Sequence, residues 1–455
     1  MMMTPEIVRA IAIAVRDAGG RALLVGGCVR DELLGLEPKD HDVEVFGVPA
    51  DRLRGILEGV GRVEAVGESF AVYKVGGVDV SLPRRESKTG RGHKGFAVTG
   101  DPDLSIEEAA RRRDFTINAI SRDPLNRQIL DPFNGGSDLE ARRLRIVDPR
   151  TFADDSLRVL RALQFVARFE LTVDDATRAL LREIPLDDLP PERVWGEVEK
   201  LLLLAPRPSL GFALALDLGV VDRLWPEFKA LVGVPQEPEW HPEGDVWVHT
   251  LMVIDQARQR IAGLDRGPAL AIMLGAITHD FGKPMTTAVI DGRIRSPGHE
   301  EAGVAPAASF LDRLNVHSFG GFDVRHAVLG LVAHHLKPSA FKKAQTPVSD
   351  GAFRRLAQKV DLELLALLAR ADCHGRTGSF DCSAMDWFLD RARAIGVEHA
   401  APAPLVLGRH LIALGVAPGP QMGTMLKRIY EKQLDGEIRT VDEGLAAAAA
   451  LLRGS

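Results

Sequence analysis

Glycines and acidic residues stand close together near the start of the chain, in an order that suits metal and phosphate chemistry. The stretch LLVGGCVRDELLGLEPKDHDVEVFG, residues 23–47, places Gly26 and Gly27 ahead of two aspartates, Asp40 and Asp42. On a strand, alternate residues point to the same face, so both carboxylates can hold a hard divalent cation such as Mg²⁺. Like charges this close are costly unless a cation compensates them. The spacing therefore predicts a metal site.

The glycines lead into CVRDELLG, a segment that we expect to form a short helix. Glycine lets the backbone approach a ligand closely, and the free N–H groups at a helix start suit phosphate. Arg30 falls in the first turn and is expected to pair with a triphosphate. Alone, such a glycine turn or acidic pair is most often an ordinary turn or a solvated edge. Their order and spacing together favour two-metal nucleotidyl transfer, in which one cation activates the attacking hydroxyl and the other stabilises pyrophosphate.

A second group of candidate ligands is spread over the later part of the chain. It comprises His249, the adjacent pair His279 and Asp280, and Asp372. Neutral imidazole together with carboxylate suits borderline divalent cations. A single histidine in a helix is usually only a core or surface residue, whereas an adjacent His–Asp pair with further ligands on both sides is more specific. This set therefore predicts a second metal centre.

The elements that must position these residues differ between the two parts of the chain. Up to about residue 145, RALLVGG looks like a buried strand ending in a turn, and DVEVFG and GVDVSLP alternate with the period of a strand. From DDSLRVLRALQFVARF onward the pattern becomes helical. The polar, glycine-rich segment RRESKTGRGHKGFAVTGDPD predicts a mobile loop, and the prolines of VGVPQEPEWHPEGD predict a boundary near residue 236.

Composition narrows the class of protein. The chain has 455 residues, of which 45% are hydrophobic, and a net charge of −6, so a nucleic-acid partner would have to meet local basic patches. The three cysteines, Cys28, Cys373 and Cys382, show no CxxC spacing, which argues against a disulfide framework or structural zinc and fits a reducing cytoplasm. The N-terminus predicts an amphipathic helix instead of a signal peptide, and no apolar run is long enough to span a membrane.

The acidic motif resembles that of a known superfamily. LVGGCVRDELLG followed by KDHDVEV is similar to the first motif of the nucleotidyltransferases, in the branch of bacterial CCA-adding enzymes and poly(A) polymerases. RRRDFTINAI resembles the second motif of that branch, in which an arginine, here Arg113, would hold the triphosphate. Asp79, in VDVSLP, would be the third carboxylate of the superfamily, although an ordinary acid at a sheet edge would look the same.

The segment DDSLRVLRALQFVARF resembles the EDxxRxxR motif of the same branch. The resemblance implies that Asp155 and Arg158 form a protein template that hydrogen-bonds the Watson–Crick edge of the incoming base. Arg161, one helical turn further on, would contact phosphate or sugar. The usual glutamate is replaced by Asp154, which weakens any inference about switching between C and A.

The histidine set resembles the HD superfamily of phosphohydrolases, whose pattern is H…HD…D. The four residues named above match that pattern, and Lys283 after the pair could meet a phosphate. His299 and one histidine of AHHLKP, His335 in preference to His334, would match the further ligands of bimetallic members. An HD fold kept only as a structural platform is the alternative.

Both modules in this order resemble the bacterial family of CCA-adding enzymes with an HD domain. The resemblance implies an α+β fold: a head with a mixed sheet and helices, then an all-α neck, an HD domain and a helical tail. The expected boundaries are 1–145 for the head, 146–235 for the neck, 236–395 for the HD domain and 396–455 for the tail.

The implied activity is addition of CCA to tRNA 3′ ends from CTP and ATP, with Mg²⁺ and without a nucleic-acid template. The HD domain would use Ni²⁺, Co²⁺ or Mn²⁺ to hydrolyse 2′,3′-cyclic phosphates and phosphate monoesters. No membrane and no protein partner are implied, and the location would be cytoplasmic. A poly(A) polymerase, an enzyme adding only CC or only A, and an RNA-binding protein with an inactive HD domain are the rivals.

Overall fold

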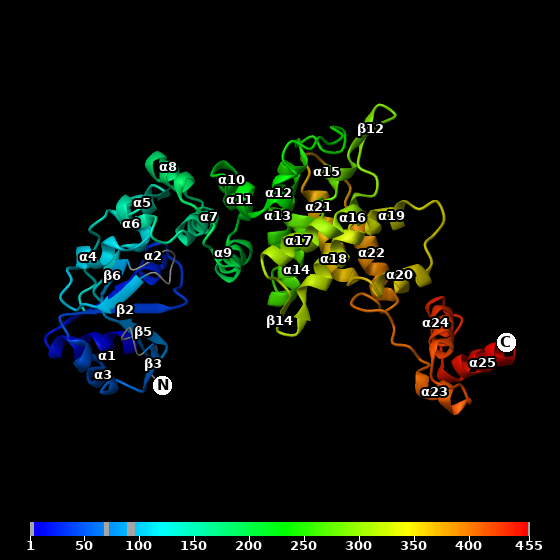
Figure 1. Ribbon diagram of the computed structural model, residues 1–455, viewed down its shortest axis with the longest axis horizontal. Helices are drawn as coiled ribbons and strands as arrows, with labels where there is room; N and C mark the ends of the chain where they lie inside the picture. The colour runs from blue at the N-terminus through cyan, green and yellow to red at the C-terminus, as the bar shows by residue number, and fades with distance from the viewer. Residues whose placement is uncertain (1–3, 68–71, 89–95, 454–455) are drawn as a thin grey trace. The chain divides into compact units, whose positions relative to one another are not determined.

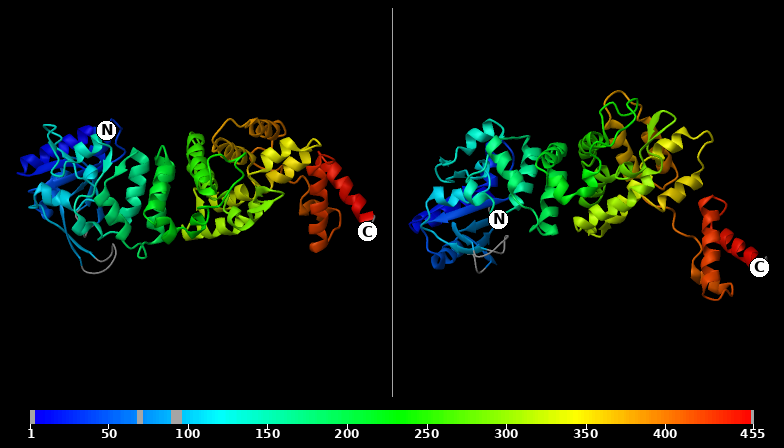
Figure 2. Two further views of the ribbon diagram at one scale, coloured as in Figure 1. Left: turned by 90° about the horizontal axis from the view of Figure 1, so that it is seen from above. Right: turned by 45° about the horizontal axis from the view of Figure 1, so that its top comes forward.

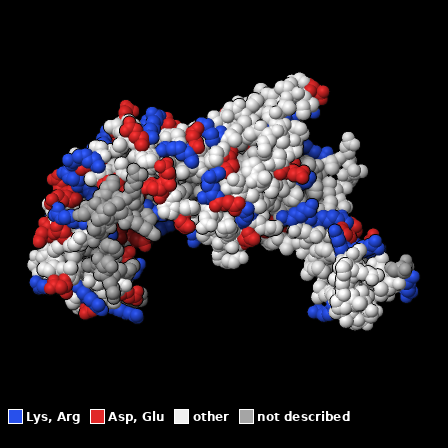
Figure 3. Space-filling view, in the orientation of Figure 1, with Lys and Arg blue, Asp and Glu red and all other residues white. Residues whose placement is uncertain are grey.

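The computed structural model describes residues 4–67, 72–88 and 96–453 (Figures 1 and 2). The chain separates into two compact units. The first runs to Leu201 and includes Asp217–Gly219, and the second comprises Leu202–Leu216 and the chain from Val220 onward. On the face seen in Figure 3, basic and acidic side chains are interspersed, in keeping with the small net charge.

A seven-stranded mixed sheet forms the centre of the first unit. Its strand order is β3-β4-β5-β2-β1-β8-β9. The bounds are β1 Arg21–Val25, β2 His41–Phe46, β3 Val63–Gly67, β4 Val72–Val75, β5 Val78–Ser81, β8 Ser121–Arg122 and β9 Ile129–Leu130. β2 pairs antiparallel with β1 and parallel with β5. The expected mixed sheet is therefore confirmed.

Helices cover this sheet because each presents one apolar stripe. The first helix, α1 (Thr4–Asp17), buries Val8, Ile11, Ala12 and Val15, which recur with the period of a helix. Three further helices of the head are α2 Gly27–Leu33, α3 Ala50–Glu58 and α4 Ile106–Arg111. A capping box between Ser105 and Glu108 fixes the start of α4.

The segment expected to be a mobile loop instead contains two strands, so that expectation was wrong for its two ends. β6 (Arg84–Lys88) and β7 (Phe96–Gly100) pair antiparallel with each other, and residues 89–95 lie outside the described residues. A two-stranded ladder is held by main-chain hydrogen bonds, which polar residues form as well as apolar ones. A polar composition therefore gave a misleading signal.

The first unit continues as helices, as the sequence predicts. These are α5 Gly135–Glu140, α6 Pro149–Phe152, α7 Leu157–Phe169, α8 Asp175–Glu183 and α9 Pro191–Leu204, which crosses into the second unit. A short 3₁₀ helix, η1, spans Thr116–Asn118, and β10 (Arg143–Leu144) pairs with β11 (Thr172–Val173). In the core, Phe115 packs edge to face against Phe152 and against Phe165 of α7.

The second unit is almost entirely helical. Its helices are α10 Pro208–Asp217, α11 Val220–Leu224, α12 Pro226–Lys229, α13 Val246–Arg260, α14 Arg266–Thr278, α15 Lys283–Thr286, α16 His299–Ala302, α17 Val304–Arg313, α18 Val324–His334, α19 Lys337–Lys343, α20 Asp350–Ala357, α21 Leu362–His374, α22 Ser383–Ala394, α23 Gly408–Ala413, α24 Pro420–Leu434 and α25 Val441–Arg453. Two small hairpins pair β12 (Ala288–Ile290) with β13 (Arg293–Arg295) and β14 (Ser318–Phe319) with β15 (Phe322–Asp323).

The core of this unit forms where α13, α14, α18 and α21 pack together. α14 is the central helix, because nearly every residue from Gly267 to Thr278 is buried. The last helices have an apolar cluster of their own, which includes Leu411, Met425 and Ile429. Among the described residues, no helix combines the length and the apolar character needed to cross a bilayer.

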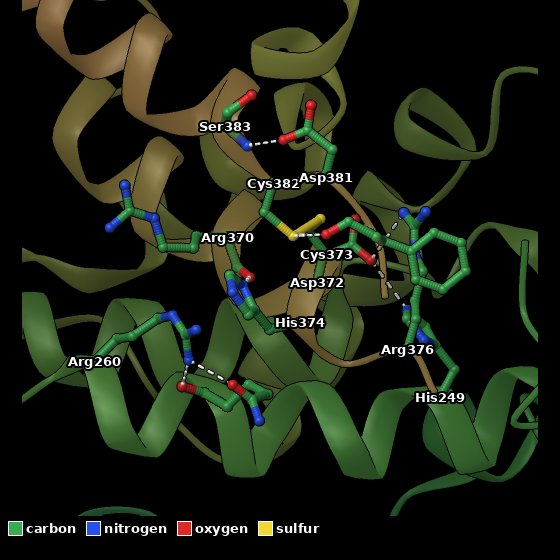
Figure 4. Close-up of a disulfide and its surroundings, with 12 residues drawn as sticks. His249, Arg260, Arg370, Asp372, Cys373, His374, Arg376, Asp381, Cys382 and Ser383 are labelled. Atoms are coloured by element: carbon green, nitrogen blue, oxygen red, sulfur yellow. Dashed lines mark hydrogen bonds and ion pairs between the residues drawn. A yellow bond between two sulfur atoms is a disulfide. The ribbon is translucent and has the colours of Figure 1, made fainter. Parts of the chain in front are cut away.

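A disulfide joins Cys373 to Cys382 (Figure 4), and Cys28 is free and buried. The expectation that the cysteines form no disulfide was therefore wrong. Cys373 lies in the last turn of α21 and Cys382 immediately precedes α22, and the turn between these helices brings the two Cα atoms to 6.0 Å. The spacing of the cysteines along the chain did not indicate that the backbone turns back between them. The cysteines consequently no longer support a reducing compartment.

Candidate active sites of the head and the helical unit

Three carboxylates meet at one end of the neighbouring strands β2 and β5, in the middle of the head sheet. Asp42 in β2 is the direct register partner of Asp79 in β5, so their side chains lie on the same face, and Asp40 immediately precedes β2. Asp42 is open to solvent, yet partial desolvation raises its pKa, Arg113 opposes this rise, and Asp79 and Asp40 add to it. A cation bound between these acids would remove their mutual repulsion.

Gly26 allows the side chain of Arg113 to approach this cluster of acids. Gly26 has a φ of 73°, and a Cβ there would lie 2.5 Å from Nη1 of Arg113. Arg113 donates to the buried carboxylate of Glu44 at 3.2 Å, and Arg112 donates to the same oxygen at 2.6 Å. The predicted residues Gly26, Asp42 and Arg113 are thus brought together, with Gly27 as the first residue of α2.

Arg30 has a different environment from the open phosphate contact expected for it. Its side chain is buried, with Nη1 on the side-chain oxygen of Asn118 at 2.6 Å and Nη2 on Asp31 at 2.6 Å. Its guanidinium also lies over the rings of Phe165 and Phe169 in α7. A direct bond from Arg30 to a triphosphate would require these protein contacts to be exchanged. The physical reason is that α7, distant in sequence, covers this turn of α2.

The two residues expected to read the base, Asp155 and Arg158, lie just before α7 and in its first turn. Both oxygens of Asp155 accept from Arg193, at 3.1 and 2.9 Å. Arg158 donates to two main-chain carbonyls, those of Thr151 at 3.1 Å and Arg112 at 2.7 Å. Sequence reasoning missed Arg193. The only indication in the sequence was that the segment ERVWGEVEKLL, at the start of α9, fits the family.

Arg161 faces the second motif. Its Nε donates to Asp114 at 2.7 Å, and Asp114 also accepts from Asn118 at 2.9 Å. Burial alone would raise the pKa of Asp114, but Arg161 and Asn118 hold it below its ordinary value. A continuous set of polar contacts therefore runs from α7 through Asn118 to Arg30.

All six histidine and aspartate ligands predicted in the helical unit come together as two adjacent triads. His249, His279 and Asp372 form the first, and Asp280, His299 and His335 the second, with the ligand atoms of each triad within 4.8 Å of one another. Every member is buried. His334, the alternative at the ambiguous position, belongs to neither triad.

The turn after α14 brings the triads together. His279 caps α14, and its ring lies 5.7 Å from that of His249 and 5.3 Å from that of His335. A Cβ on Gly282 would lie 2.0 Å from the carbonyl oxygen of His299, so only glycine lets this turn approach His299 so closely.

The histidine tautomers fit a divalent cation. The Nδ1 atoms of His279, His299 and His335 lie 3.0, 2.7 and 2.9 Å from backbone carbonyls, so each donates its proton there. That leaves each Nε2 as a lone pair. The Nε2 atoms of His299 and His335 face each other at 3.2 Å, and within the described part of the chain Nε2 of His279 makes no hydrogen bond. A divalent cation would compensate converging lone pairs of this kind.

The charges of this centre agree with metal binding. Burial, together with His279 and His299, lowers the pKa of His335 to about 3, which keeps its ring neutral. Burial alone would raise the pKa of Asp280, but His279 and Lys283 hold it well below its ordinary value. Lys283 lies 2.7 Å from Asp280 and donates to Gln236 at 2.7 Å.

Two members of the first triad, His249 and Asp372, are drawn in Figure 4 near the disulfide. His249 lies 3.1 Å from Asp372, and Arg376 lies 3.8 Å from the same carboxylate oxygen. Sequence reasoning missed Glu243, which contacts His249 at 2.8 Å on the side away from Asp372. Its only signal was its place just before His249 in the segment EWHPEGDVWVH.

A mixed-sheet head with clustered acids, followed by a helical unit with a histidine–aspartate centre, defines a nucleotidyltransferase coupled to an HD-type centre. The poly A polymerase head domain family matches residues 22–145, and the family described as probable RNA and SrmB-binding site of polymerase A matches residues 170–231. A multifunctional CCA protein of Xanthomonas euvesicatoria is 38% identical over 422 residues, covering 89% of this chain and 96% of its own. The chain belongs to the multifunctional CCA protein family.

Solved structures agree on the fold. The CCA-adding enzyme of Bacillus stearothermophilus in complex with CTP is 20% identical, with a TM-score of 0.67 and coverage of 100% of this chain and 99% of that chain. The Thermotoga maritima CCA-adding enzyme complexed with tRNA has a TM-score of 0.57 at 20% identity, covering 98% and 95%. The expected family and the expected α+β fold are confirmed. The family and the buried ligand sets imply divalent metal.

Proposed function

We propose that the protein adds CCA to the 3′ ends of tRNA, using CTP and ATP as substrates. The observation that carries the proposal is the cluster of Asp40, Asp42 and Asp79 beside Gly26 and Arg113, in a chain of this family. Bound there, Mg²⁺ would activate the attacking 3′-hydroxyl and stabilise the leaving pyrophosphate. Oxygen-only ligands are the set that Mg²⁺ prefers.

The residues of the head have distinct parts in this proposal. Gly26 and Gly27 let the triphosphate approach the backbone, and Arg113 supplies positive charge beside it. Arg30 supports this turn from beneath through Asn118. The four expected domains remain our proposal for how the chain is divided, and the cytoplasm, where tRNA and both nucleotides are present, is the proposed location.

Base selection is assigned to Asp155 and Arg158. A carboxylate offers about four acceptor sites and a guanidinium five donors, so each can serve a base edge besides its present partners. Arg193 holds Asp155 in place with two hydrogen bonds. Cytosine and adenine both carry an exocyclic amine next to a ring-nitrogen acceptor, whereas uracil and guanine present a different edge that leaves donors or acceptors of the site unpaired. Arg161 is held by Asp114 and is proposed to contact phosphate or sugar.

The helical unit is proposed to be a phosphohydrolase acting on 2′,3′-cyclic phosphates and phosphate monoesters. Its imidazole-rich ligand set favours Ni²⁺, Co²⁺ or Mn²⁺ over Mg²⁺. His299 and His335 are proposed to hold a second ion beside the first. Lys283 lies beside Asp280 at this centre, and its ammonium group is proposed to bind a substrate phosphate.

Incorporation of labelled CTP and ATP into tRNA lacking CCA tests the first proposal. Addition of two C residues and one A is expected, whereas long A tails would indicate a poly(A) polymerase and a CC or A product a partial enzyme. An Arg158→Ala variant should accept UTP and GTP more readily, while Arg150→Ala, which changes an exposed arginine, should not. An Arg158→Ala variant with unchanged selectivity would refute the protein template.

A further inference from the structure

Glu243 is a buried acid that no part of the proposed chemistry yet uses. It lies just before α13, and only 1% of its side chain is exposed. Its Oε1 is 2.8 Å from Nδ1 of His249 and 2.9 Å from Nδ1 of His241, and its Oε2 accepts from the main-chain N–H of Thr377 at 3.2 Å. A buried carboxylate thus joins three separate parts of the unit.

The position of Glu243 relative to His249 determines which nitrogen of the ring faces the metal centre. Nδ1 of His249 is on Glu243, and Nε2 is 3.1 Å from Asp372. With its Nδ1 proton donated to Glu243, the ring presents the lone pair of Nε2 to the first triad. The other three histidines of the centre obtain the same tautomer from backbone carbonyls. A carboxylate is a stronger acceptor than a carbonyl and raises the basicity of the ligand ring.

We propose that Glu243 is a positioning residue for the metal centre, which fixes the orientation and tautomer of His249 while securing the segment that follows Asp372. Through Thr377, Glu243 anchors the chain between Cys373 and Cys382, directly after the helix that carries Asp372. Both ligands of the first triad that come from outside the α14 turn, His249 and Asp372, therefore depend on one side chain.

A metal held instead by His241, Glu243 and His249 is the competing arrangement, because their ligand atoms also lie close together. Such a metal would take Nδ1 of His249 and leave Nε2 to donate to Asp372. The first triad would then lose His249 as a ligand, although His279 and Asp372 converge on it. The two arrangements assign opposite roles to Glu243, as an orienting acceptor or as a ligand.

This inference rests on the proposed metal centre, and its test measures metal binding by the full-length protein. Co²⁺ affinity is determined by competition with a chelator, and the visible Co²⁺ spectrum reports the ligand field. Glu243→Ala should weaken Co²⁺ binding about 10–100-fold and shift the spectrum. Glu243→Gln, which keeps one acceptor for His249, should recover part of the affinity. Glu239→Ala, which changes an exposed acid in the same segment, should leave both unchanged.

Three results would overturn the inference in distinguishable ways. If Glu243→Ala and Glu243→Gln both keep the Co²⁺ affinity and the Co²⁺ spectrum of the wild type, Glu243 does not position the ligands, and the proposed metal centre still stands. Loss of the Co²⁺ site in Glu243→Gln to the extent seen in His249→Ala would make Glu243 a ligand. Absence of Co²⁺ binding by the wild-type protein would remove the proposed centre itself. The helical content and the urea unfolding of each metal-free variant serve as the folding control. If Glu243→Ala does not fold, Glu243→Gln is used for the test by itself.

Discussion

Individual residues in this protein acquire their chemistry from neighbours that are remote in sequence. Asp42 is an exposed acid at a strand start, but partial desolvation and Asp79 on the adjacent strand raise its pKa, and Arg113 after α4 opposes this rise. Asp114 is an ordinary acid by sequence, but Arg161 and Asn118 make it a buried anion. Substitution of each of these two aspartates by asparagine therefore tests the role of a single carboxylate charge.

Asp42→Asn should abolish nucleotide addition, because an amide is a weaker metal ligand and carries no charge. A loss of at least about 10³-fold is expected, corresponding to about 4 kcal/mol of transition-state stabilisation. The measurement is the rate of CTP incorporation into tRNA lacking CCA. Asp51→Asn, which changes an exposed acid in α3, is the matched control. A rate for Asp42→Asn close to that of the control would contradict the assignment.

The pKa of Asp114 predicts a pH dependence of stability. Because its folded-state pKa lies below the ordinary value, its contribution is complete above that value and is lost as the pH falls through the folded pKa. The free energy of unfolding of the wild type should thus fall as the pH drops below the ordinary carboxyl range toward the lower folded-state pKa, and that of Asp114→Asn should fall less.

Urea unfolding at several pH values provides this measurement, with Asp103→Asn as the control because Asp103 is exposed. The control should follow the wild-type pH dependence. Equal slopes for the wild type and Asp114→Asn would show that the ion pair with Arg161 contributes nothing that depends on protonation.

At the scale of elements, function depends on how helix ends are secured. Asp155 lies just before α7 and Arg158 in its first turn, and the far end of α7 covers Arg30 with Phe165 and Phe169. α21 presents Asp372 in its last turn, beside the disulfide at Cys373 (Figure 4). The position of a ligand at a helix end therefore depends on how firmly the adjoining turn is held.

Reduction of the Cys373–Cys382 disulfide should destabilise the helical unit. Closing a loop of this length stabilises a fold by about 2–3 kcal/mol in the chain-entropy model. Urea unfolding of the wild type with and without reductant measures this difference. Cys382→Ala should match the reduced wild type and should not respond to reductant. A response of the variant as large as that of the wild type would assign the effect to another group.

At the scale of the whole molecule, two different ligand chemistries occupy two compact units. The first unit offers carboxylates at a solvent-accessible end of strands β2 and β5, and the second offers four histidines and two aspartates in a buried centre. Hard oxygen ligands favour Mg²⁺, whereas imidazole favours later transition metals. The two activities are therefore expected to be separable by metal.

Asp280→Ala should eliminate phosphohydrolysis, because it removes a proposed ligand of the metal centre in the second unit. CCA addition should stay within about twofold of the wild type, because the carboxylates proposed for that reaction lie in the first unit. The protein is stripped of metal, Mg²⁺ or Ni²⁺ is added back, and both reactions are assayed. Mg²⁺ should restore addition, and Ni²⁺ should restore hydrolysis. Asp291→Ala, in the exposed β12–β13 turn, is the control. Loss of addition in a folded Asp280→Ala protein would show that the two centres are coupled.

The sequence by itself determined the residue types of both sites and the class of the main elements that carry them. Alternating apolar residues predicted β2 and β5, and the helical period predicted α7 and the helical second unit, because these patterns are local. The GG turn, the paired aspartates and the His–Asp pair identified the family, which the comparisons confirm.

Only the tertiary structure decided which of those residues meet, and with what partners. The parallel register of β2 with β5 put Asp79 beside Asp42, and packing of α7 buried Arg30. The Arg193–Asp155 pair, the disulfide and the contacts of Glu243 were not predicted. Each joins segments whose mutual approach depends on long-range packing and the path of intervening turns. Local periodicity carries no information about such contacts, because burial and charge depend on the neighbours that the fold supplies.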